Sequence, residues 1–430
     1  MARQTNTEIR SYTFYQVFPR QHSKSHDFSG VVKDLDRIHA MGVDVLYVLP
    51  VHPIGEQARK GQHGSPYSIV DYLEIHPGLG THEDFLLMID EAHKRGMKVM
   101  MDIVFNHTSR DSKLVKEKPD WFYKNAKGEF ANRIGDWSDI TDLDFKKRDV
   151  WNYLIDVLKF WASKVDGFRC DVAPLLPLDF WMEARKKMDL INSNLIWLSE
   201  SVEPGFIKYL RDHGYECYSD SEMYQAFDVC YDYDIFSYMN EYLKNPKKLS
   251  RWLEEIARQD VIYPNNYIKL RSFENHDQER LRSKVRDHAH FMQMMALMFF
   301  LKGSAFIYAG QEHEIFEKPS LFEIDLIPWN SENSIEVFIK RLSSLKKQPI
   351  FSFGIFNLIH SVNVAVMSYA YQNQFLVGIF NLEGATSVEV PLIDGNYTNF
   401  INDEDIVVEH GKIELNNQPI IIDTLKEHIK

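Results

Sequence analysis

Three carboxylates, each following a short apolar stretch of the sequence, are the residues best suited to chemistry. Asp171 ends the segment GFRCD at residues 167–171, Glu200 follows the segment WLS, and Asp277 lies in the segment FENHDQER. Like charges at close range cannot all ionise at their free pKa values, so such a cluster keeps one carboxyl protonated near neutral pH. A protonated and an ionised carboxyl across a small gap are what cleavage of a glycosidic bond requires. One donates a proton to the leaving oxygen, and the other attacks the anomeric carbon.

Arg169 would share one face of a short buried strand with Asp171, because side chains alternate along a strand. Charged groups on the inner face of an apolar strand are costly unless they are paired or used in function. Two interpretations fit this pair: a structural salt bridge, or an arginine that keeps Asp171 ionised and aimed. Cys170 should point away from Asp171, so we interpret it as a packing residue and not as a nucleophile.

Further polar groups lie at the ends of two predicted strands. Asp102 and His107 are in the segment DIVFNH, and His276 comes directly before Asp277. Taken singly, His107 would be a core histidine and Asp102 a loop cap. Their occurrence at successive strand ends is hard to explain structurally, and it predicts that these groups face one opening.

The elements that must position these residues are eight β-rich stretches that alternate with helices. They lie at residues 11–18, 43–49, 97–105, 167–171, 195–199, 227–231, 268–273 and 304–308. This count predicts an α/β fold, a parallel (β/α)8 TIM barrel. A doubly wound open sheet is the alternative, but no glycine-rich phosphate loop follows the first strand. Among the helices, one is predicted at residues 31–41 with Leu35, Ile38 and His39 on one side. Another begins at Thr81, with Asp84 as its capping-box partner.

The domain organisation follows from breaks in this alternation. Residues 1–107 and 146–348 are predicted to form the barrel. Residues 108–145, polar and aromatic with little periodicity, form a small subdomain inserted after the third strand. Residues 349–430 form an antiparallel all-β C-terminal domain. Its short strands are expected at residues 363–371, 374–381, 387–392, 406–409 and 420–423.

Composition narrows the function classes. A formal net charge of −13 argues against a nucleic-acid binder, which would present a basic face. No apolar stretch follows the N-terminal Arg3, so no secretory signal is expected. The longest apolar run, residues 291–301, is too short to span a bilayer and predicts a buried helix, so no membrane association is expected. The three cysteines form no CxxC pair, which fits a reducing compartment, and we expect a cytoplasmic location.

Together these residues resemble the α-amylase superfamily of retaining glycoside hydrolases, glycoside hydrolase family 13. The segments DIVFNH, GFRCD and ENHD and the glutamate at position 200 carry the resemblance, in family order over about residues 11–330. Lesser matches are GSPYSIVDY from Gly64, ITDLD from Ile140 and GSAFIYAGQE from Gly303. The resemblance implies that Asp171 is the nucleophile that forms a covalent glucosyl-enzyme and Glu200 the general acid, then base.

The resemblance also implies roles for the surrounding residues. Asp277 would bind sugar hydroxyls and stabilise the oxocarbenium-like transition state, and Arg169 would orient Asp171. Tyr67 would stack on the sugar ring, with plain packing as its alternative. Two histidines and an aspartate would hydrogen-bond the glucose at the cleavage site: Asp102, His107 and His276. Four aromatic residues are candidates for further glucose sites, with core or lid packing as the alternative: Trp121, Phe122, Trp137 and Trp329.

Two departures from the family pattern matter. Many secreted members carry Lys-His three and four residues after the nucleophile, where they contribute to a calcium site. Here Pro174 and Leu175 stand at those positions, so we expect no calcium and no other cofactor. The insert is also short, which predicts an open groove. Both features resemble intracellular maltodextrin-processing members such as neopullulanases and maltogenic amylases.

Three functions stay open from the sequence. The first is a hydrolase that cleaves α-1,4 linkages in small α-glucan oligosaccharides, with α-1,6 specificity as a variant. The second is a transglucosylase, such as a glucanotransferase or a sucrose- or trehalose-converting enzyme, that passes the same covalent intermediate to a sugar. The third is a catalytically silent sugar-binding scaffold, which is disfavoured because all three carboxylates are present. Nothing in the sequence predicts an oligomeric state.

Overall fold

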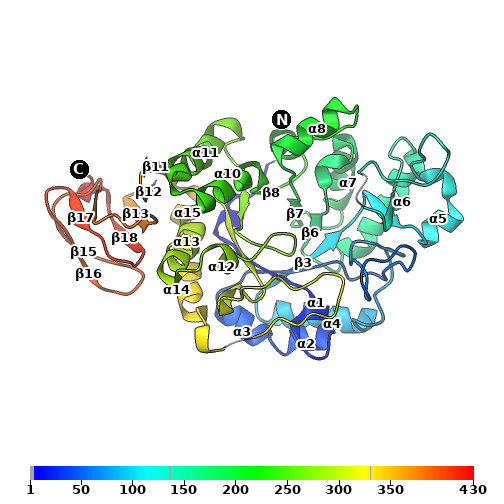
Figure 1. The fold of residues 1–430 in the computed structure, drawn as a ribbon, viewed down its shortest axis with the longest axis horizontal. Helices are drawn as coiled ribbons and strands as arrows, with labels where there is room; N and C mark the ends of the chain where they lie inside the picture. Colours follow the sequence, from blue (N-terminus) through cyan, green and yellow to red (C-terminus); the bar gives the residue numbers. More distant parts are fainter. Residues whose placement is uncertain (1–3, 135–136, 330) are drawn as a thin grey trace.

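Eight parallel strands close into a barrel in the order β1-β10-β9-β8-β7-β6-β3-β2, as the computed structural model shows for residues 4–134, 137–329 and 331–430 (Figure 1). The predicted α/β barrel is therefore confirmed. The strands are β1 (Thr13–Val17), β2 (Val45–Val48), β3 (Lys98–Ile103), β6 (Gly167–Cys170), β7 (Ile196–Ser199), β8 (Val229–Tyr231), β9 (Lys269–Arg271) and β10 (Ser304–Tyr308).

The strands that carry the candidate residues lie next to one another. β6 pairs in parallel with β3, which sets Arg169 opposite Asp102, and with β7, which sets Cys170 opposite Ser199. A glycine begins β6 because space is short there: a Cβ at Gly167 would lie 2.6 Å from the carbonyl oxygen of Ile196. The close approach of these strands places the residues that follow them at one edge of the barrel.

Helices cover the outside of the barrel. α4 (His82–Lys94) begins with the predicted capping box, in which Thr81 and Asp84 exchange hydrogen bonds. The helix predicted at residues 31–41 is two helices, α2 (Phe28–Val32) and α3 (Leu35–Ala40), and His39 is exposed. Asp34 lies between them and binds Arg37 with its carboxylate. The longer remaining helices are α6 (Arg148–Ala162), α7 (Leu178–Met188), α8 (Pro204–Asp212), α10 (Tyr233–Lys244), α11 (Leu249–Ile262), α13 (His288–Phe300) and α14 (Glu336–Lys346). The short ones are α1 (Pro19–His22), α9 (Asp220–Met223), α12 (Leu281–Lys284) and α15 (Pro349–Phe353).

The apolar run at residues 291–301 lies mostly in α13, and all of its side chains except that of Met292 are buried, as predicted. Within the described ranges, no helix combines the length and the apolar character that crossing a bilayer demands.

The insert after β3 contains more regular structure than its sequence predicts. β4 (His107–Ser109) pairs antiparallel with β5 (Ile140–Asp142), so that His107 lies opposite Asp142. A short helix, α5 (Lys113–Glu117), follows β4. These three-residue strands are too short to leave a period-2 pattern, which explains why the sequence did not reveal them.

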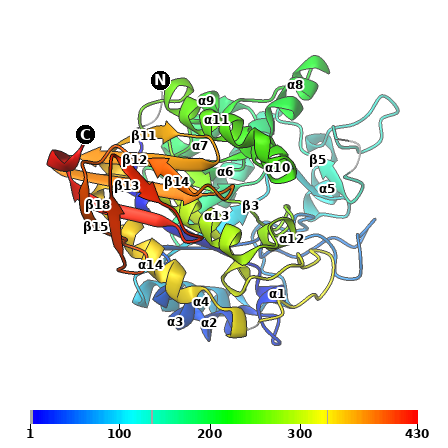
Figure 2. The same ribbon diagram turned by 60° about the vertical axis from the view of Figure 1, so that its left-hand side comes forward.

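The C-terminal domain is antiparallel and all-β, as predicted. Its main sheet has the order β11-β12-β13-β18, and two further pairs, β14–β17 and β15–β16, complete it. The bounds are β11 (Ile355–His360), β12 (Val364–Tyr371), β13 (Gln374–Asn381), β14 (Ser387–Glu389), β15 (Gly395–Thr398), β16 (Asp405–Val408), β17 (Lys412–Glu414) and β18 (Ile420–Leu425). Figures 1 and 2 both place this domain on the side of the barrel away from α5 and the insert.

Candidate active site

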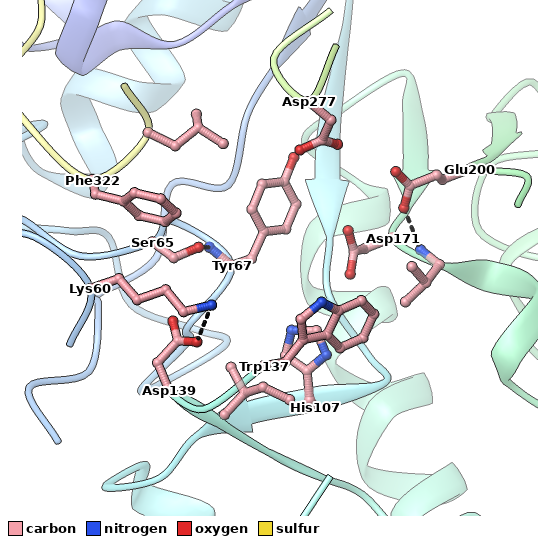
Figure 3. Close-up of a pocket in the computed structure, with 13 residues that line it drawn as sticks. Lys60, Ser65, Tyr67, His107, Trp137, Asp139, Asp171, Glu200, Asp277 and Phe322 are labelled. Atoms are coloured by element: carbon pink, nitrogen blue, oxygen red, sulfur yellow. Dashed lines mark hydrogen bonds and ion pairs between the residues drawn. The ribbon is translucent and has the colours of Figure 1, made fainter. Parts of the chain in front are cut away.

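The three predicted carboxylates line one cavity of about 290 Å³ (Figure 3). Asp171 directly follows β6, Glu200 directly follows β7, and Asp277 lies in the loop after β9. The carboxyl ends of parallel barrel strands share one mouth, which explains why residues about a hundred positions apart meet here. The other lining residues are Lys60, Ser65, Tyr67, His107, Trp137, Asp139, Ile140, Val172, Leu321 and Phe322.

A single guanidinium holds the acidic groups together beneath the cavity. Nη1 of the fully buried Arg169 lies 2.9 Å from Oδ1 of Asp171 and 2.8 Å from Oδ1 of Asp102. Its Nη2 lies 2.6 Å from Oε1 of Glu200. Arg169 therefore does more than the predicted pairing with Asp171, because it joins three strands through their acids.

The backbone after Asp171 is strained. Val172 adopts the left-handed region with φ 36°, which a β-branched residue rarely occupies. This conformation directs its main-chain N–H at Oε2 of Glu200, 2.7 Å away. Strain of this kind costs about 1–3 kcal/mol and persists where the surroundings over-determine it, typically at functional sites. Here it fixes the carboxyl of Glu200 beside Asp171.

Burial controls the protonation of these two acids. Burial and the charge of Glu200 raise the pKa of Asp171 well above its usual range, against the opposing effect of Arg169. Burial raises the pKa of Glu200 too, although Arg169 again opposes it. Both shifts therefore favour a proton on one of these two neighbouring acids, which share the charge of Arg169 with Asp102.

Asp277 behaves differently. Its carboxylate is 44% exposed at the cavity and lies 2.9 Å from Nε2 of His276. Burial acts to raise its pKa, but the charge and hydrogen bond of His276 outweigh burial and lower the pKa of Asp277 to about 2. Asp277 is therefore ionised over the whole physiological pH range.

Asp102 and His276 lie behind the cavity wall and do not line it. Both are almost fully buried, and both contact the hydroxyl of Tyr67, which lies 2.9 Å from Oδ2 of Asp102 and 2.7 Å from Nε2 of His276. The Tyr67 ring stacks on the His276 ring with centroids 5.4 Å apart. In this structure the two residues position Tyr67, while the direct sugar contacts expected of them stay predictions.

His107 does line the cavity. Burial lowers the pKa of His107 to about 4, so its imidazole is neutral at neutral pH and can both donate and accept a hydrogen bond. Trp137 lies against it, with ring centroids 5.7 Å apart. The other three aromatic candidates for sugar sites do not line the cavity: Phe122 is buried, Trp121 packs on Tyr153, and Trp329 packs on His22 and His313.

Sequence reasoning missed most of the remaining lining residues. Lys60 and Ser65 come from the loop after β2, Asp139 and Ile140 from the insert, and Leu321 and Phe322 from the loop after β10. Ser65 and Ile140 stand in the segments GSPYSIVDY and ITDLD, but nothing in those segments marks these two as lining residues, and the other four carry no periodicity or motif of their own. Lys60 and Asp139 form an ion pair of 3.1 Å between two loops, which only the folded chain brings together.

The residues near Asn106 do not fit a calcium ion, which requires several oxygen ligands. The amide nitrogen of Asn106 donates to Oδ1 of Asp142, at 3.3 Å, and Arg133 binds Oδ2 with its main-chain N–H and its guanidinium, at 2.8 and 3.1 Å. A cation of the protein itself thus balances this carboxylate, and Pro174 and Leu175 supply no side-chain oxygen. Across the three described ranges, no group of three or more His, Cys, Asp or Glu is arranged to hold a metal.

A closed parallel barrel with an acid pair and a third carboxylate at the carboxyl ends of its strands defines a barrel glycoside hydrolase. The family described as "Alpha amylase, catalytic domain" matches residues 16–348, and "Bacterial Alpha amylase C-terminal domain" matches residues 357–422. The chain therefore belongs to the α-amylase family of glycoside hydrolases.

Several known proteins are similar to this chain. The crystal structure of an α-amylase from Lactobacillus plantarum is 41% identical, with 97% of this chain and 100% of that chain covered and a TM-score of 0.94. That of a maltogenic α-amylase, AmyB, from Thermotoga neapolitana is 32% identical, with 97% and 99% covered and a TM-score of 0.87. An α-1,4-glucan:maltose-1-phosphate maltosyltransferase from Picrophilus torridus is 25% identical, over 89% of this chain and 63% of that protein. The chain spans about half to two thirds of the length of such curated relatives.

Proposed function

We propose that the protein is a retaining hydrolase that cleaves α-1,4 linkages in maltodextrins and related short α-glucans. The observation that carries the proposal is the meeting of Asp171, Glu200 and Asp277 at one cavity, with Asp171 and Glu200 bound to the same guanidinium. The name of the similar protein from Thermotoga neapolitana, a maltogenic α-amylase, supports the substrate class.

The reaction would proceed in two displacements. In the first, Glu200 donates its proton to the glycosidic oxygen while the carboxylate of Asp171 attacks the anomeric carbon, which leaves a glycosyl-enzyme ester. In the second, Glu200, now ionised, takes a proton from water, and the water oxygen displaces Asp171 from the sugar. Asp277, ionised throughout, would stabilise the positive charge that develops on the sugar ring.

A second candidate is transfer of the glycosyl group to a sugar in place of water. The relative from Picrophilus torridus, named as a maltosyltransferase, favours this alternative. The first displacement is the same in both reactions, so the chemistry of Asp171 and Glu200 does not separate them. A cytoplasmic location and independence of calcium are proposed from the sequence.

Product analysis tests the proposal. The protein is incubated separately with maltotriose, isomaltose, trehalose and sucrose. Free glucose and maltose from maltotriose alone support the hydrolase, while longer or isomerised products support the transferase. Activity on isomaltose alone would contradict the α-1,4 assignment.

Two variants test the roles of the acids. Asp171→Asn should abolish turnover while the fold and sugar binding persist, and Glu200→Gln should lower kcat by about 10²–10⁴-fold on substrates with a poor leaving group. Asp156→Asn removes an exposed carboxylate of α6 (69% exposed) and is the matched control. Near-normal activity of Asp171→Asn would refute its assignment as the nucleophile.

A further inference from the structure

The end of the cavity farthest from the acid pair is lined by residues of three segments that are distant in the sequence. In Figure 3, Lys60, Asp139 and Phe322 lie on the side opposite Asp171 and Glu200. Nζ of Lys60 lies 3.1 Å from Oδ1 of Asp139, and the ion pair joins the loop after β2 to the insert. We name these three residues the end wall.

Direct contacts hold the end wall in place. The main-chain N–H of His63 donates to the carbonyl oxygen of Phe322 at 2.9 Å, which joins the loop after β2 to the loop after β10. The loops touch so closely that a Cβ at Gly61, which has φ +62°, would lie 2.7 Å from Cβ of Phe322. On the other side, the hydroxyl of Ser68 donates to the carbonyl oxygen of Asp139 at 3.0 Å.

Arg20 fastens the same two loops from beneath. Its buried guanidinium donates to the carbonyl oxygens of His63 and Gly64, at 3.2 and 3.0 Å, and to that of Leu321. Burying a cation is costly unless it is hydrogen-bonded. The three carbonyl groups that satisfy Arg20 come from both loops, so its hydrogen bonds hold the loops together. The end wall is therefore a built part of the cavity and not a chance approach of surface loops.

The chemistry decides which part of a glucan meets the end wall. Glu200 protonates the leaving oxygen, so the sugar that departs lies on the Glu200 side of the cavity. The sugar that Asp171 retains, and any sugar attached to it, extends toward the opposite side. In an α-1,4 chain that direction leads to the non-reducing end, so the non-reducing part of the substrate points at Lys60, Asp139 and Phe322.

We propose, resting on the function proposed above, that the end wall makes the enzyme act from the non-reducing end of α-glucans and release short saccharides. Lys60, 33% exposed, and the carboxylate of Asp139 offer a donor and an acceptor for the hydroxyls of a terminal sugar. The cavity volume of about 290 Å³ is at the small end of ligand pockets and suits a short saccharide segment. Lys60 and Asp139 are thus specificity-determining residues, in contrast to the open groove that the short insert predicts.

Maltoheptaose with free ends, compared with maltoheptaose blocked at O4 and O6 of its non-reducing sugar, tests this inference. The wild type should cleave the free glucan at least about tenfold faster than the blocked one, a ratio within reach of a few pocket contacts. With a label on the reducing end, the first labelled products should be shorter by one constant, small number of glucose units.

Variants of the end wall should relax this preference. Lys60→Ala, and more strongly Lys60→Ala combined with Phe322→Ala, should raise cleavage of the blocked glucan relative to the free one. Lys113→Ala is the matched control, because Lys113 forms a 3.4 Å ion pair with Asp71 between the same two segments but lines no part of the cavity. The control should keep the wild-type ratio.

The outcomes separate the two proposals. Equal cleavage of free and blocked maltoheptaose by the wild type overturns end-directed action and leaves the hydrolase standing. An unchanged ratio in both end-wall variants overturns the role of Lys60 and Phe322. Cleavage of neither glucan overturns the proposed function, and the inference falls with it.

Discussion

Replacing Arg169 by methionine removes the one cation that three buried carboxylates share. Its guanidinium lies within 2.6 to 2.9 Å of Asp102, Asp171 and Glu200, and its side chain is fully buried. Unit charges about 4 Å apart attract by about 4 kcal/mol at an effective dielectric constant of about 20. Breaking a buried ion pair costs about 3–5 kcal/mol, since the remaining charge stays buried and uncompensated. We therefore expect Arg169→Met to lower the free energy of unfolding by about 3–5 kcal/mol at neutral pH.

The same variant should shift the pH dependence in a fixed direction. Arg169 lowers the pKa values of Asp171 and Glu200, so its removal raises them further. The folded variant then binds more protons than the unfolded chain as the pH falls, so its stability deficit should shrink between pH 7 and about pH 5. The acidic limb of kcat/KM against pH should move to higher pH, because that limb reports ionisation of the nucleophile.

Urea unfolding at both pH values and pH–rate profiles on maltotriose measure these effects. Arg271→Met is the matched control: Arg271 is also fully buried and lies 2.8 Å from Asp232, but neither residue lines the cavity. The control should lose similar stability and keep the wild-type pH profile. A stability loss under about 1 kcal/mol in Arg169→Met, or an acidic limb that stays in place, would refute the reasoning.

Three further predictions follow from other buried groups. Burial lowers the pKa of Lys346 well below its usual range, and its Nζ donates to the carbonyl oxygen of Leu301. The unfolded chain therefore binds one more proton between this lowered pKa and about 10.4, so stability should rise with pH by up to about 1.4 kcal/mol per pH unit there. Lys346→Met should abolish that slope in urea titrations, and a slope that survives would contradict the assignment. EDTA should leave activity unchanged because Arg133 balances Asp142; loss of activity that calcium restores would refute this. Gly303 has φ +130°, and a Cβ there would lie 2.2 Å from the carbonyl oxygen of Lys269, so Gly303→Ala should destabilise by more than about 1 kcal/mol in urea unfolding. Gly96→Ala, at φ +78° with no atom within 4 Å, is its control and should cost less.

The barrel and its strand-end acids could be predicted because their information is local. A strand buried on both faces has a continuous apolar run, and a charged residue within or after it stands out, as Asp102, Arg169 and Asp171 do. Alternation with helices then implies which ends of the strands meet. The ends of helices were harder to predict. One helix was predicted at residues 31–41, but Asp34 separates α2 from α3, and its side chain binds Arg37 and His22.

The rest of the site depends on contacts that have no local signature. His63 and Phe322 are joined by a main-chain hydrogen bond across more than 250 residues of sequence, and Lys60 and Asp139, from two different loops, are joined by a side-chain ion pair. The sequence also did not predict which residues line the cavity and which lie behind them. The alternation of side chains along a strand assigns Asp102 to a face of the strand, but it does not show that Tyr67 lies between Asp102 and the cavity. The short strands β15 and β17 were missed for the same reason as β4 and β5. β11 has six residues, but only Phe356 in it is buried, so it lacks the apolar pattern by which the other strands were predicted.

This division between local and long-range information matches a division between chemistry and specificity. Asp102, Asp171 and Glu200 stand on or directly after barrel strands, where Arg169 binds all three. The end wall stands on loops whose geometry depends on Arg20 and on contacts between distant segments. Substitutions in the end wall should therefore change which bond of a glucan is cut while the pH profile stays constant. Substitutions around Arg169 should move the pH profile while the products stay the same, because the two sets of residues share the cavity but not their supporting contacts.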